Sequence, residues 1–571
     1  GNARGDNDGP DLAPRRRSRR SEPEHFFLAR PDADCYTHCR MNQLLFGDNL
    51  DWLRNKEVFP DGSVDLIYLD PPFNSKRDYN LLFRSPKGKQ SEAQIEAFKD
   101  SWSWGDQAEQ ELAELIKHKN TDVAQMINAL VAFLGRNDMT AYLVMMSTRL
   151  LEMHRVLKPT GSLYLHCDPT ASHYLKVVLD AVFGFEHYRN EIIWKRSNPK
   201  SHGSINFPTC SDTIFRYTKS HTFTFHQPYE THDPEYVESA YRYSDEKGQY
   251  RLLPLLNPND NRPNLTYEFM GVTRVWRWTR ERMHQAQMDG LIVQTKPGAV
   301  PQYKKYLEDS KGRTVTNVWT DIQQAAGNES LGYPTQKPIA LLERIVEASS
   351  NKGDVVLDPF CGCGTAVHAA PKLKRKWIGI DITHLAISLI EKRLKDAFKS
   401  RCEFAVHGTP KDIEAARNLA ARDKYQFQYW AVSLVEAQPF QGKKKGADGG
   451  VDGLKFFHDV DKAGARKIVV SVKGGGLKAD DVRALNHVRE RETADIALFI
   501  SLEEPTKGMI ADAASAGFYE SATGKKFPRL QLLTIEGLLS GKQRAEHPDH
   551  QPDLNFKKAK AEAASKQEAL L

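Results

Sequence analysis

One stretch decides the fold of this chain: Asp65-Leu66-Ile67-Tyr68-Leu69-Asp70-Pro71-Pro72-Phe73-Asn74. A short apolar run with β-branched and aromatic residues predicts a buried strand. The strand ends at the two prolines, because proline has no N–H to donate to a sheet ladder. The sequence therefore places a carboxylate, a free carbonyl and an aromatic ring at the end of a buried strand.

The tetrad Asp70-Pro71-Pro72-Phe73 suits the binding of an exocyclic amine on a planar base. The Asp70 carboxylate and the Pro71 carbonyl can accept the two N–H bonds of the amine, which frees its lone pair for attack. Phe73 can stack on a base that has left the double helix. A strand that simply ends in a proline turn is the alternative interpretation of these four residues.

The composition sets bounds on the whole chain. Its 571 residues suggest three to four domains, and 40% hydrophobic residues are enough to build ordinary cores. A net charge of +6 is small for this length, so a nucleic-acid surface must be local. Seven cysteines without regular pairing indicate a reducing compartment, and no apolar run reaches transmembrane length.

Strands and helices are predicted to alternate along residues 31–405. Such alternation is typical of a parallel, doubly wound α/β sheet. Residues 194–320 break the pattern with interleaved basic and aromatic residues, among them Trp194, Trp276 and Tyr306. We expect this insert to contact nucleic acid, and the alternative is a surface of long polar side chains that lie along apolar neighbours. Residues 1–30 read as a disordered basic tail and 546–571 as a second tail.

A second motif follows the strand predicted at 353–357. It reads Asp358-Pro359-Phe360-Cys361-Gly362-Cys363-Gly364-Thr365, and a further strand ends in Asp381, 381 − 364 = 17 residues after Gly364. Small residues at a strand-to-helix turn let the backbone approach a ligand closely. A glycine turn followed by an acid about 20 residues later is typical of adenosyl binding, in which the acid holds the ribose.

These motifs, with Tyr-Pro-Thr-Gln-Lys-Pro at 333–338 between the insert and the glycine turn, resemble the β group of DNA amino-methyltransferases over about residues 40–400. The resemblance implies a Rossmann-like sheet, S-adenosylmethionine as methyl donor, and double-stranded DNA as partner. It also implies a target-recognition role for residues 194–320, a homodimer, and a cytoplasmic, nucleoid-associated location in a bacterial type of cell.

The same resemblance assigns the site residues. It implies a catalytic motif made of Asp70, Pro71, Pro72 and Phe73. Thr335 and Lys337 would meet the methionine carboxylate, Asp381 the ribose, and Asp48 would lie near the adenine of the donor. The donor-binding loop would contain Asp358, Phe360, Gly362, Gly364 and Thr365.

The target amine follows from two further observations. Methylation of carbon 5 of cytosine uses a cysteine within a Pro-Cys pair in the enzymes of that class, and no such pair occurs here. Leu69-Asp70-Pro71-Pro72 resembles adenine-N6 enzymes more than the Ser-Pro-Pro form of cytosine-N4 enzymes. We therefore expect adenine-N6 methylation, with cytosine-N4 methylation as the alternative. The transfer is direct and needs no metal.

Residues 406–545 read as a separate, smaller α/β domain with a helix over 415–435. Asp452 precedes one strand and Lys473 ends the next, which is typical of metal-dependent phosphodiesterases. The domain resembles the Mrr-like restriction endonucleases of the PD-(D/E)XK group. The resemblance implies Mg²⁺ on Asp452, with Lys473 as the motif lysine and Glu436 as a helix acid.

Ser471 departs from that pattern, because the group carries Glu, Asp or Gln at this position and a serine hydroxyl is a poor Mg²⁺ ligand. Two hypotheses therefore stand for the C-terminal domain, a Mg²⁺-dependent endonuclease in a restriction–modification polypeptide and a module that only binds DNA. A third hypothesis makes the whole chain a non-enzymatic DNA-binding protein with a degenerate donor pocket.

Overall fold

A computed structural model describes most of the chain from Asn42 onward. The described residues are 42–72, 78–84, 90–99, 103–198, 205–327, 329–331, 333, 335–440, 450–459, 465–548 and 559–562, with 78–84 and 90–99 described by their backbone only. The predicted tail at 1–30, Phe73 and most of the predicted tail at 546–571 lie outside these residues. No helix among the described residues has the length and apolar character needed to span a membrane.

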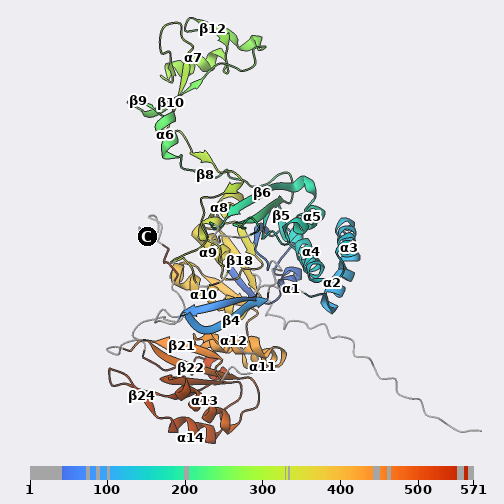
Figure 1. Cartoon of the computed structure of the whole chain (residues 1–571), viewed down its shortest axis with the longest axis vertical. Coiled ribbons are helices and arrows are strands. Elements are labelled where there is room, and N and C mark those ends of the chain that lie inside the picture. The colour runs from blue at the N-terminus through green and yellow to red at the C-terminus, as the bar shows by residue number, and fades with distance from the viewer. Residues whose placement is uncertain are drawn as a thin grey trace, which may run out of the picture. The chain divides into compact units, whose positions relative to one another are not determined.

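The main domain is built on a nine-stranded sheet, in the order β16-β6-β7-β5-β2-β17-β18-β1-β19 (Figure 1). All neighbouring strands run parallel except β7, which is antiparallel to both β5 and β6. The strands are β1 Asn42–Phe46, β2 Val64–Leu69, β5 Leu157–Cys167, β6 Tyr188–Lys195, β7 Ser211–Thr218, β16 Val318–Trp319, β17 Val355–Asp358, β18 Lys376–Asp381 and β19 Phe404–His407.

Helices cover both faces of this sheet. Along β2, Ile67 and Leu69 pack in one apolar cluster, whereas Leu66 and Tyr68 pack in another. This follows from the two-residue period of a strand, which sends alternate side chains to opposite faces. The first face is covered by α1 Asn49–Arg54, α2 Asp106–Ile116, α3 Thr121–Leu134, α4 Asp138–Val156 and α5 Ser172–Phe183, and the second by α8 Ile339–Ser349, α9 Thr365–Lys372 and α10 His384–Phe398. The doubly wound α/β prediction is therefore confirmed.

The winding direction reverses between β2 and β17. From β2 the chain continues to its neighbour β5, and from β17 it continues to its neighbour β18 on the opposite side. The carboxyl ends of β2 and β17 therefore flank a topological switch point, which is where ligands bind in open α/β sheets.

The predicted insert differs from the observed one at both ends. Strands β7 and β16 lie within residues 194–320 but pair in the main sheet, so the part outside that sheet is 219–317. It contains β8 Tyr229–Glu230, α6 Pro234–Ala240, β9 Tyr243–Asp245, β10 Gly248–Pro254, β11 Thr266–Phe269, β12 Val272–Val275, α7 Arg280–Met288, β13 Ile292–Val293, β14 Gln302–Tyr306 and β15 Arg313–Thr314.

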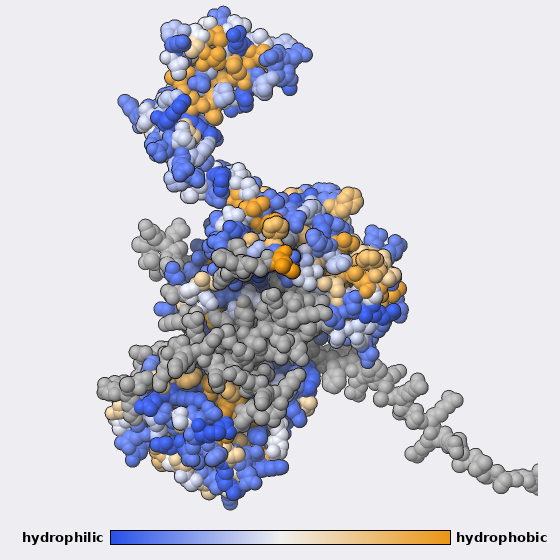
Figure 2. All heavy atoms as spheres, in the orientation of Figure 1, coloured by the Kyte–Doolittle hydropathy of each residue, from blue (hydrophilic) through white to orange (hydrophobic). Residues whose placement is uncertain are grey.

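The aromatic residues of this region mostly form cores. Trp276 is completely buried in the apolar cluster of the insert, and Trp194 and Tyr306 are also buried. Figure 2 shows apolar side chains gathered around α7. The expectation that these three rings are free to stack on bases is therefore wrong. Large aromatic side chains are stabilised by burial in an apolar core, and that is where these three lie.

The C-terminal domain has a five-stranded sheet in the order β20-β21-β22-β23-β26. The helix expected over 415–435 is two helices, because Asp423 accepts the Tyr425 and Gln426 N–H groups and so caps a new helix. The elements are α11 Ile413–Arg422, α12 Lys424–Leu434, β20 Gln438–Pro439, β21 Gly453–Phe457, β22 Arg466–Lys473, α13 Ala479–Arg491, β23 Ile496–Ser501, α14 Lys507–Ser515, β24 Phe518–Glu520, β25 Lys526–Pro528, β26 Leu530–Thr534 and α15 Ile535–Leu539.

Candidate active site

Four acidic residues lie at one edge of the nine-stranded sheet. Asp70 follows β2, Asp358 ends β17, Asp381 ends β18, and Asp48 follows β1. These four strands are neighbours and run parallel, so their carboxyl ends meet at the same edge. The segments that the sequence separates by about 290 residues, around Asp70 and around Gly362, therefore converge at the switch point.

Lys337 joins two of the predicted motifs. Its Nζ donates to Asp70 Oδ2 and, at 3.5 Å, to the Thr335 carbonyl. Only 8% of the Lys337 residue surface is exposed. The other oxygen, Asp70 Oδ1, is buried and has no hydrogen-bond partner among the described residues. An acceptor left in this state is costly unless a ligand donates to it.

The glycine turn is closed by Asp381. Gly362 and Gly364 have φ values of +50° and +75°, which other residues rarely adopt. The Gly362 N–H donates to Asp381 Oδ2 at 2.9 Å, and Oδ1 accepts from the Thr383 N–H and hydroxyl at 2.9 and 2.8 Å. These bonds tie the Asp381 carboxylate to the glycine turn and to Thr383, the residue before α10.

The remaining predicted residues lie around this turn. The Thr365 hydroxyl donates to the Lys337 carbonyl at 3.2 Å, and the Phe360 N–H donates to Asp358 Oδ1 at 3.2 Å. Pro71 is buried and Pro72 is half-buried, while Phe73 lies outside the described residues. Apart from Phe73, the structure therefore brings the predicted residues of both motifs to one edge.

Three carboxyl groups and one lysine lie close together in the site. Burial raises the pKa of Asp358 well above its usual range, and the nearby Asp70 and Asp381 carboxylates raise it further. Lys337 opposes this shift, and burial also raises the pKa of Asp381. Burial and the neighbouring carboxylates therefore favour the neutral form of Asp358, and a cation bound beside it would favour the ionised form.

Arg149 is a buried residue of the site that the sequence reasoning missed. From α4 it donates through Nη2 to both oxygens of Asp48 at 2.9 Å and through Nε to Asn49 Oδ1 at 2.7 Å. Asn49 in turn donates to the Pro359 carbonyl at 2.8 Å, next to the glycine turn. Asp48 also accepts the Leu50 N–H at 2.7 Å and so caps α1. The only sequence signal was an arginine within an apolar helical stretch.

A second polar group that was missed lies beneath the Asp70 segment. The Tyr68 hydroxyl contacts His166 Nδ1 at 3.0 Å, and His166 Nε2 contacts Asp212 Oδ2 at 3.2 Å. Burial raises the pKa of Tyr68 well above its usual range. Burial works in the same direction on Asp212, but the hydrogen bond with His166 and the charges of His166, Lys337 and Arg196 together outweigh it and lower the pKa of Asp212. These three residues come from three strands, so their proximity could not be read from spacing.

In the C-terminal domain, the Asp452 carboxylate already has several partners. Oδ1 accepts from Gln428 Nε2 at 3.1 Å, and Oδ2 accepts from the Val472 N–H at 2.7 Å and the Ser471 hydroxyl at 3.3 Å. Lys473 pairs with Asp481 at 3.2 Å. No group of three His, Cys, Asp or Glu residues that could hold a metal ion occurs within the described residues. Within the described residues, the Asp452 carboxylate is thus bonded to uncharged donors, and the Mg²⁺ ion stays a prediction.

The predicted helix acid is also wrong. Glu436 lies after α12, with φ +54° and a side chain 81% exposed, and it contacts Lys455 at 3.5 Å rather than Asp452. The helix residue that reaches Asp452 is Gln428, eight residues earlier and within α12. The sequence reasoning extended the helix too far, because α12 ends at Leu434 and Glu436 lies beyond the part in which helical spacing sets the direction of a side chain.

The fold and the acidic edge define a doubly wound α/β enzyme class with an Asp-Pro-Pro segment at the switch point. The chain belongs to the DNA methylase family, because the family model with that description matches residues 64–392. A second model, described as a restriction endonuclease, matches residues 419–531.

Three curated relatives show how far the likeness extends. The chain is 35% identical over 259 residues to the Type II methyltransferase M.EcaI of Enterobacter cloacae, which covers 44% of this chain and 57% of that protein. It is 28% identical over 353 residues to the Type III restriction-modification enzyme StyLTI Mod subunit of Salmonella typhimurium, which covers 59% and 50%. It is 40% identical over 113 residues to the DNA adenine methyltransferase YhdJ of Escherichia coli, which covers 19% and 38%. The chain thus spans about half the length of the first two relatives.

Proposed function

We propose that this protein transfers the methyl group of S-adenosylmethionine to the N6 amine of adenine in double-stranded DNA. The observation that carries the proposal is Asp70 Oδ1, a buried acceptor without a partner among the described residues, at the switch point beside the glycine turn. Membership of the DNA methylase family and the names of the relatives support it.

The site residues have distinct roles in this reaction. Asp70 Oδ1 and the Pro71 carbonyl accept the two N–H bonds of the target amine and direct its lone pair toward the methyl donor. Lys337 holds Asp70 in place through Oδ2, so that Oδ1 stays directed toward the amine. With both reactants fixed in line, alignment supplies much of the rate.

S-adenosylmethionine supplies an electrophilic methyl group on a sulfonium cation. The residues present fit it, since a cation beside Asp358 and Asp381 would offset the burial that raises the pKa of both carboxyl groups. Asp381 lies at the glycine turn, where its carboxylate would accept from a ribose hydroxyl, and Gly362 and Gly364 let the backbone approach the donor closely. Asp48 lies at the same edge, held by Arg149, and would face the adenine of the donor.

The choice of adenine over cytosine N4 rests on the Leu69-Asp70-Pro71-Pro72 sequence and on the name of the adenine-specific relative. Nucleoside analysis by mass spectrometry after reaction with unmethylated DNA separates the two outcomes directly. N6-methyladenine is expected, and N4-methylcytosine alone would overturn this choice.

The test of the reaction is Asp70→Ala, with Asp65→Asn as the matched control on the same strand. The variant can neither accept an N–H of the amine with a carboxylate nor hold the amine in line. Its kcat/KM should fall at least about 1000-fold, close to the fall in rate when other enzymes lose one preorganised hydrogen-bonding group. Asp65 pairs with Lys158 at 2.8 Å, away from the site, so its variant should keep activity within about threefold. Methyl transfer retained in Asp70→Ala would remove the proposal, and calorimetry with the donor shows whether the pocket is still formed.

We also propose that the C-terminal domain contacts DNA without Mg²⁺-dependent cleavage. The support is the Asp452 carboxylate, whose two oxygens are occupied by Gln428, Ser471 and the Val472 N–H. Incubation of unmethylated plasmid with the full chain and Mg²⁺ should leave it intact. Cleavage that disappears in Lys473→Ala would contradict this proposal.

A further inference from the structure

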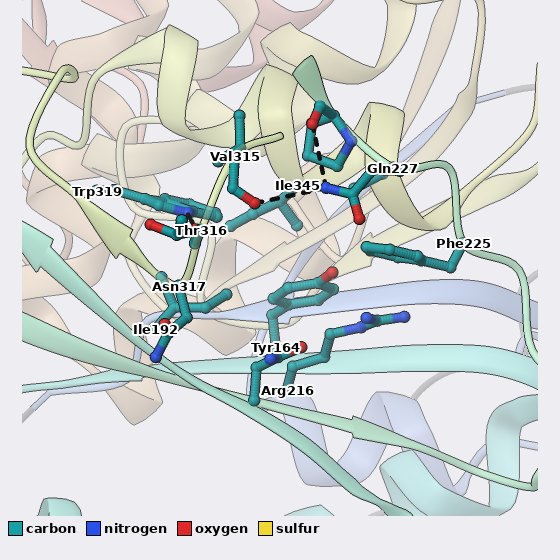
Figure 3. A pocket seen from close by; sticks show the side chains of 13 residues that line it. Tyr164, Ile192, Arg216, Phe225, Gln227, Val315, Thr316, Asn317, Trp319 and Ile345 are labelled. Carbon is teal, nitrogen blue, oxygen red and sulfur yellow. Dashed lines mark hydrogen bonds between the residues drawn. The ribbon is translucent and has the colours of Figure 1, made fainter. Parts of the chain in front are cut away.

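A pocket of about 220 Å³ lies at the base of the insert, on the face of the main sheet that α8 covers (Figure 3). Tyr164 and Arg216 line it from β5 and β7, and Ile345 lines it from α8. Two connecting segments, residues 225–228 and 315–319, complete the wall. The pocket is distinct from the acidic edge, because α8 begins beside Lys337 and about 9–14 Å of helix lies between its first residue and the pocket residues Ile345 and Ala348.

The side chain of Arg216 is the unusual feature of this pocket. The residue is 3% exposed, and its Nε and Nη2 atoms have no hydrogen-bond partner among the described residues. Its guanidinium carbon lies 4.2 Å from the ring centre of Phe225 and 5.8 Å from that of Tyr164. Burial lowers the pKa of Arg216, and Arg189 lowers it further, so the surroundings disfavour its charge.

The neighbouring Arg189 differs from Arg216, because its guanidinium donates hydrogen bonds to three acceptors. Arg189 donates through Nε to the Thr218 hydroxyl at 3.0 Å and through its other nitrogens to the Glu186 and Ser220 carbonyls at 3.2 and 3.4 Å. Arg216 has ring contacts in place of such acceptors. Ring contacts contribute only about 0.5–2 kcal/mol, less than the cost of leaving a buried cation without acceptors.

The two unpartnered atoms of Arg216 form one functional edge. Nε–H and Nη2–H point the same way on a planar guanidinium and match the two oxygens of a carboxylate or phosphate. The rings of Phe225 and Tyr164 lie next to the guanidinium, and the ring of Trp319 lines the opposite side of the pocket (Figure 3). Sites for small molecules are usually concave and apolar, with a few polar or charged groups that face the ligand. The volume of this pocket is below that of pockets that hold drug-sized ligands.

We propose that this pocket binds a small organic anion with a planar apolar body. Its carboxylate or phosphate oxygens accept from the Nε and Nη2 atoms of Arg216. Its body lies against the rings of Phe225 and Trp319. None of these residues belongs to the Asp70 site, so the proposal stands or falls independently of methyl transfer.

The position of the pocket gives the ligand a consequence for the insert. Residues 225–228 and 315–319 are the two segments through which β8 and β15, and with them the insert, are joined to the main sheet. Three bonds hold them near the pocket: the Val315 N–H donates to the Pro228 carbonyl at 3.1 Å, Gln227 Nε2 to the Val315 carbonyl at 3.4 Å, and the His226 N–H to the Ala348 carbonyl at 2.7 Å. The second segment also joins the main sheet, because the Asn317 carbonyl accepts from the Ile193 N–H at 2.9 Å and β16 pairs with β6. A ligand that touches both segments ties them to each other and to β7.

The experiment uses the full chain with benzoate, phenyl phosphate and the neutral isostere benzamide as probes. Calorimetry should detect benzoate or phenyl phosphate, and the stronger of the two identifies the kind of oxyanion. Benzamide should bind at least tenfold more weakly. Hydrogen exchange should slow in 225–228 and 315–319 on saturation. Equal binding of benzamide, or no binding of either anion, would overturn the proposal.

Variants locate the binding site. Arg216→Met should weaken binding of the anion at least tenfold, and Arg189→Met, whose donors are already satisfied, should leave it within about twofold. If Arg216→Met does not fold, Val315→Phe serves instead, because it fills the pocket and leaves the arginine in place. Anion binding that survives Val315→Phe, or is lost equally in Arg189→Met, would show that the site is elsewhere.

Discussion

Replacement of Arg149 by methionine tests how far the site depends on a buried cation. Arg149 has a side chain 5% exposed, and its Nη1 lies 3.6 Å from Glu111 Oε2 and 3.1 Å from the Met145 carbonyl. Glu111 is 10% exposed at its side chain, whereas Asp48 is 32% exposed. The variant therefore leaves the Glu111 carboxylate nearly buried without a cation, and it leaves the Asp48 carboxylate partly exposed to solvent.

The magnitude follows from these exposures. Removal of one partner from a buried ion pair costs about 3–5 kcal/mol, because the remaining charge stays desolvated. Most of that cost falls on Glu111, since solvent screens Asp48. The loss is a large part of a typical stability of about 5–15 kcal/mol. The double variant Arg149→Met with Glu111→Gln should recover about 1–3 kcal/mol, because the amide can still bond the Thr148 hydroxyl and carries no charge.

Native-state hydrogen exchange of the α4 amides measures this free energy locally, which suits a chain of several domains. Arg54→Met is the control, because Arg54 pairs with Glu114 at 2.7 Å while both side chains are about half exposed, and it should cost less than about 1 kcal/mol. Donor binding should weaken in Arg149→Met, as Asn49 then loses the group that orients it toward Pro359. A loss below about 1 kcal/mol, or no recovery in the double variant, would refute this reasoning.

Three further predictions follow from the structure. Gly364→Ala should destabilise the main domain more than Gly62→Ala. Both glycines have a positive φ, but only at position 364 would the new Cβ lie 2.7 Å from an Ile390 side-chain atom and 2.8 Å from a Val367 side-chain atom. Equal melting temperatures of the two variants would contradict this. Burial lowers the pKa of His384 to about 3, so below pH 6.5 the unfolded state binds the proton first and stability falls by about 1.4 kcal/mol for each pH unit. His384→Phe should lose that part of the slope between pH 6.5 and 4.5 in urea titrations, and an unchanged slope would count against it. Gln428→Glu combined with Ser471→Glu should create a Mg²⁺ site at Asp452, because both positions contact that carboxylate. Calorimetry should detect Mg²⁺ binding by the double variant and not by the natural chain. Equal binding by the natural chain would contradict the prediction and show that other residues hold the metal.

The sequence by itself determined the layered α/β fold and the motifs of the site. The alternation at Leu66, Ile67, Tyr68 and Leu69 is local, and a strand sends such residues to opposite faces wherever it lies. Asp70 and Gly362 each stand where a strand ends, and parallel strands end at a common edge. These inferences needed only neighbours within a few residues of one another.

The tertiary structure alone decided which distant side chains meet. Lys337 reaches Asp70 across 267 residues, and Arg149 reaches Asp48 across 101. It also decided that Gln428 rather than Glu436 faces Asp452, and that Trp276 lies in a core. Spacing along the chain carries no information on such pairs, because strand order in the sheet and helix register set the distances between them.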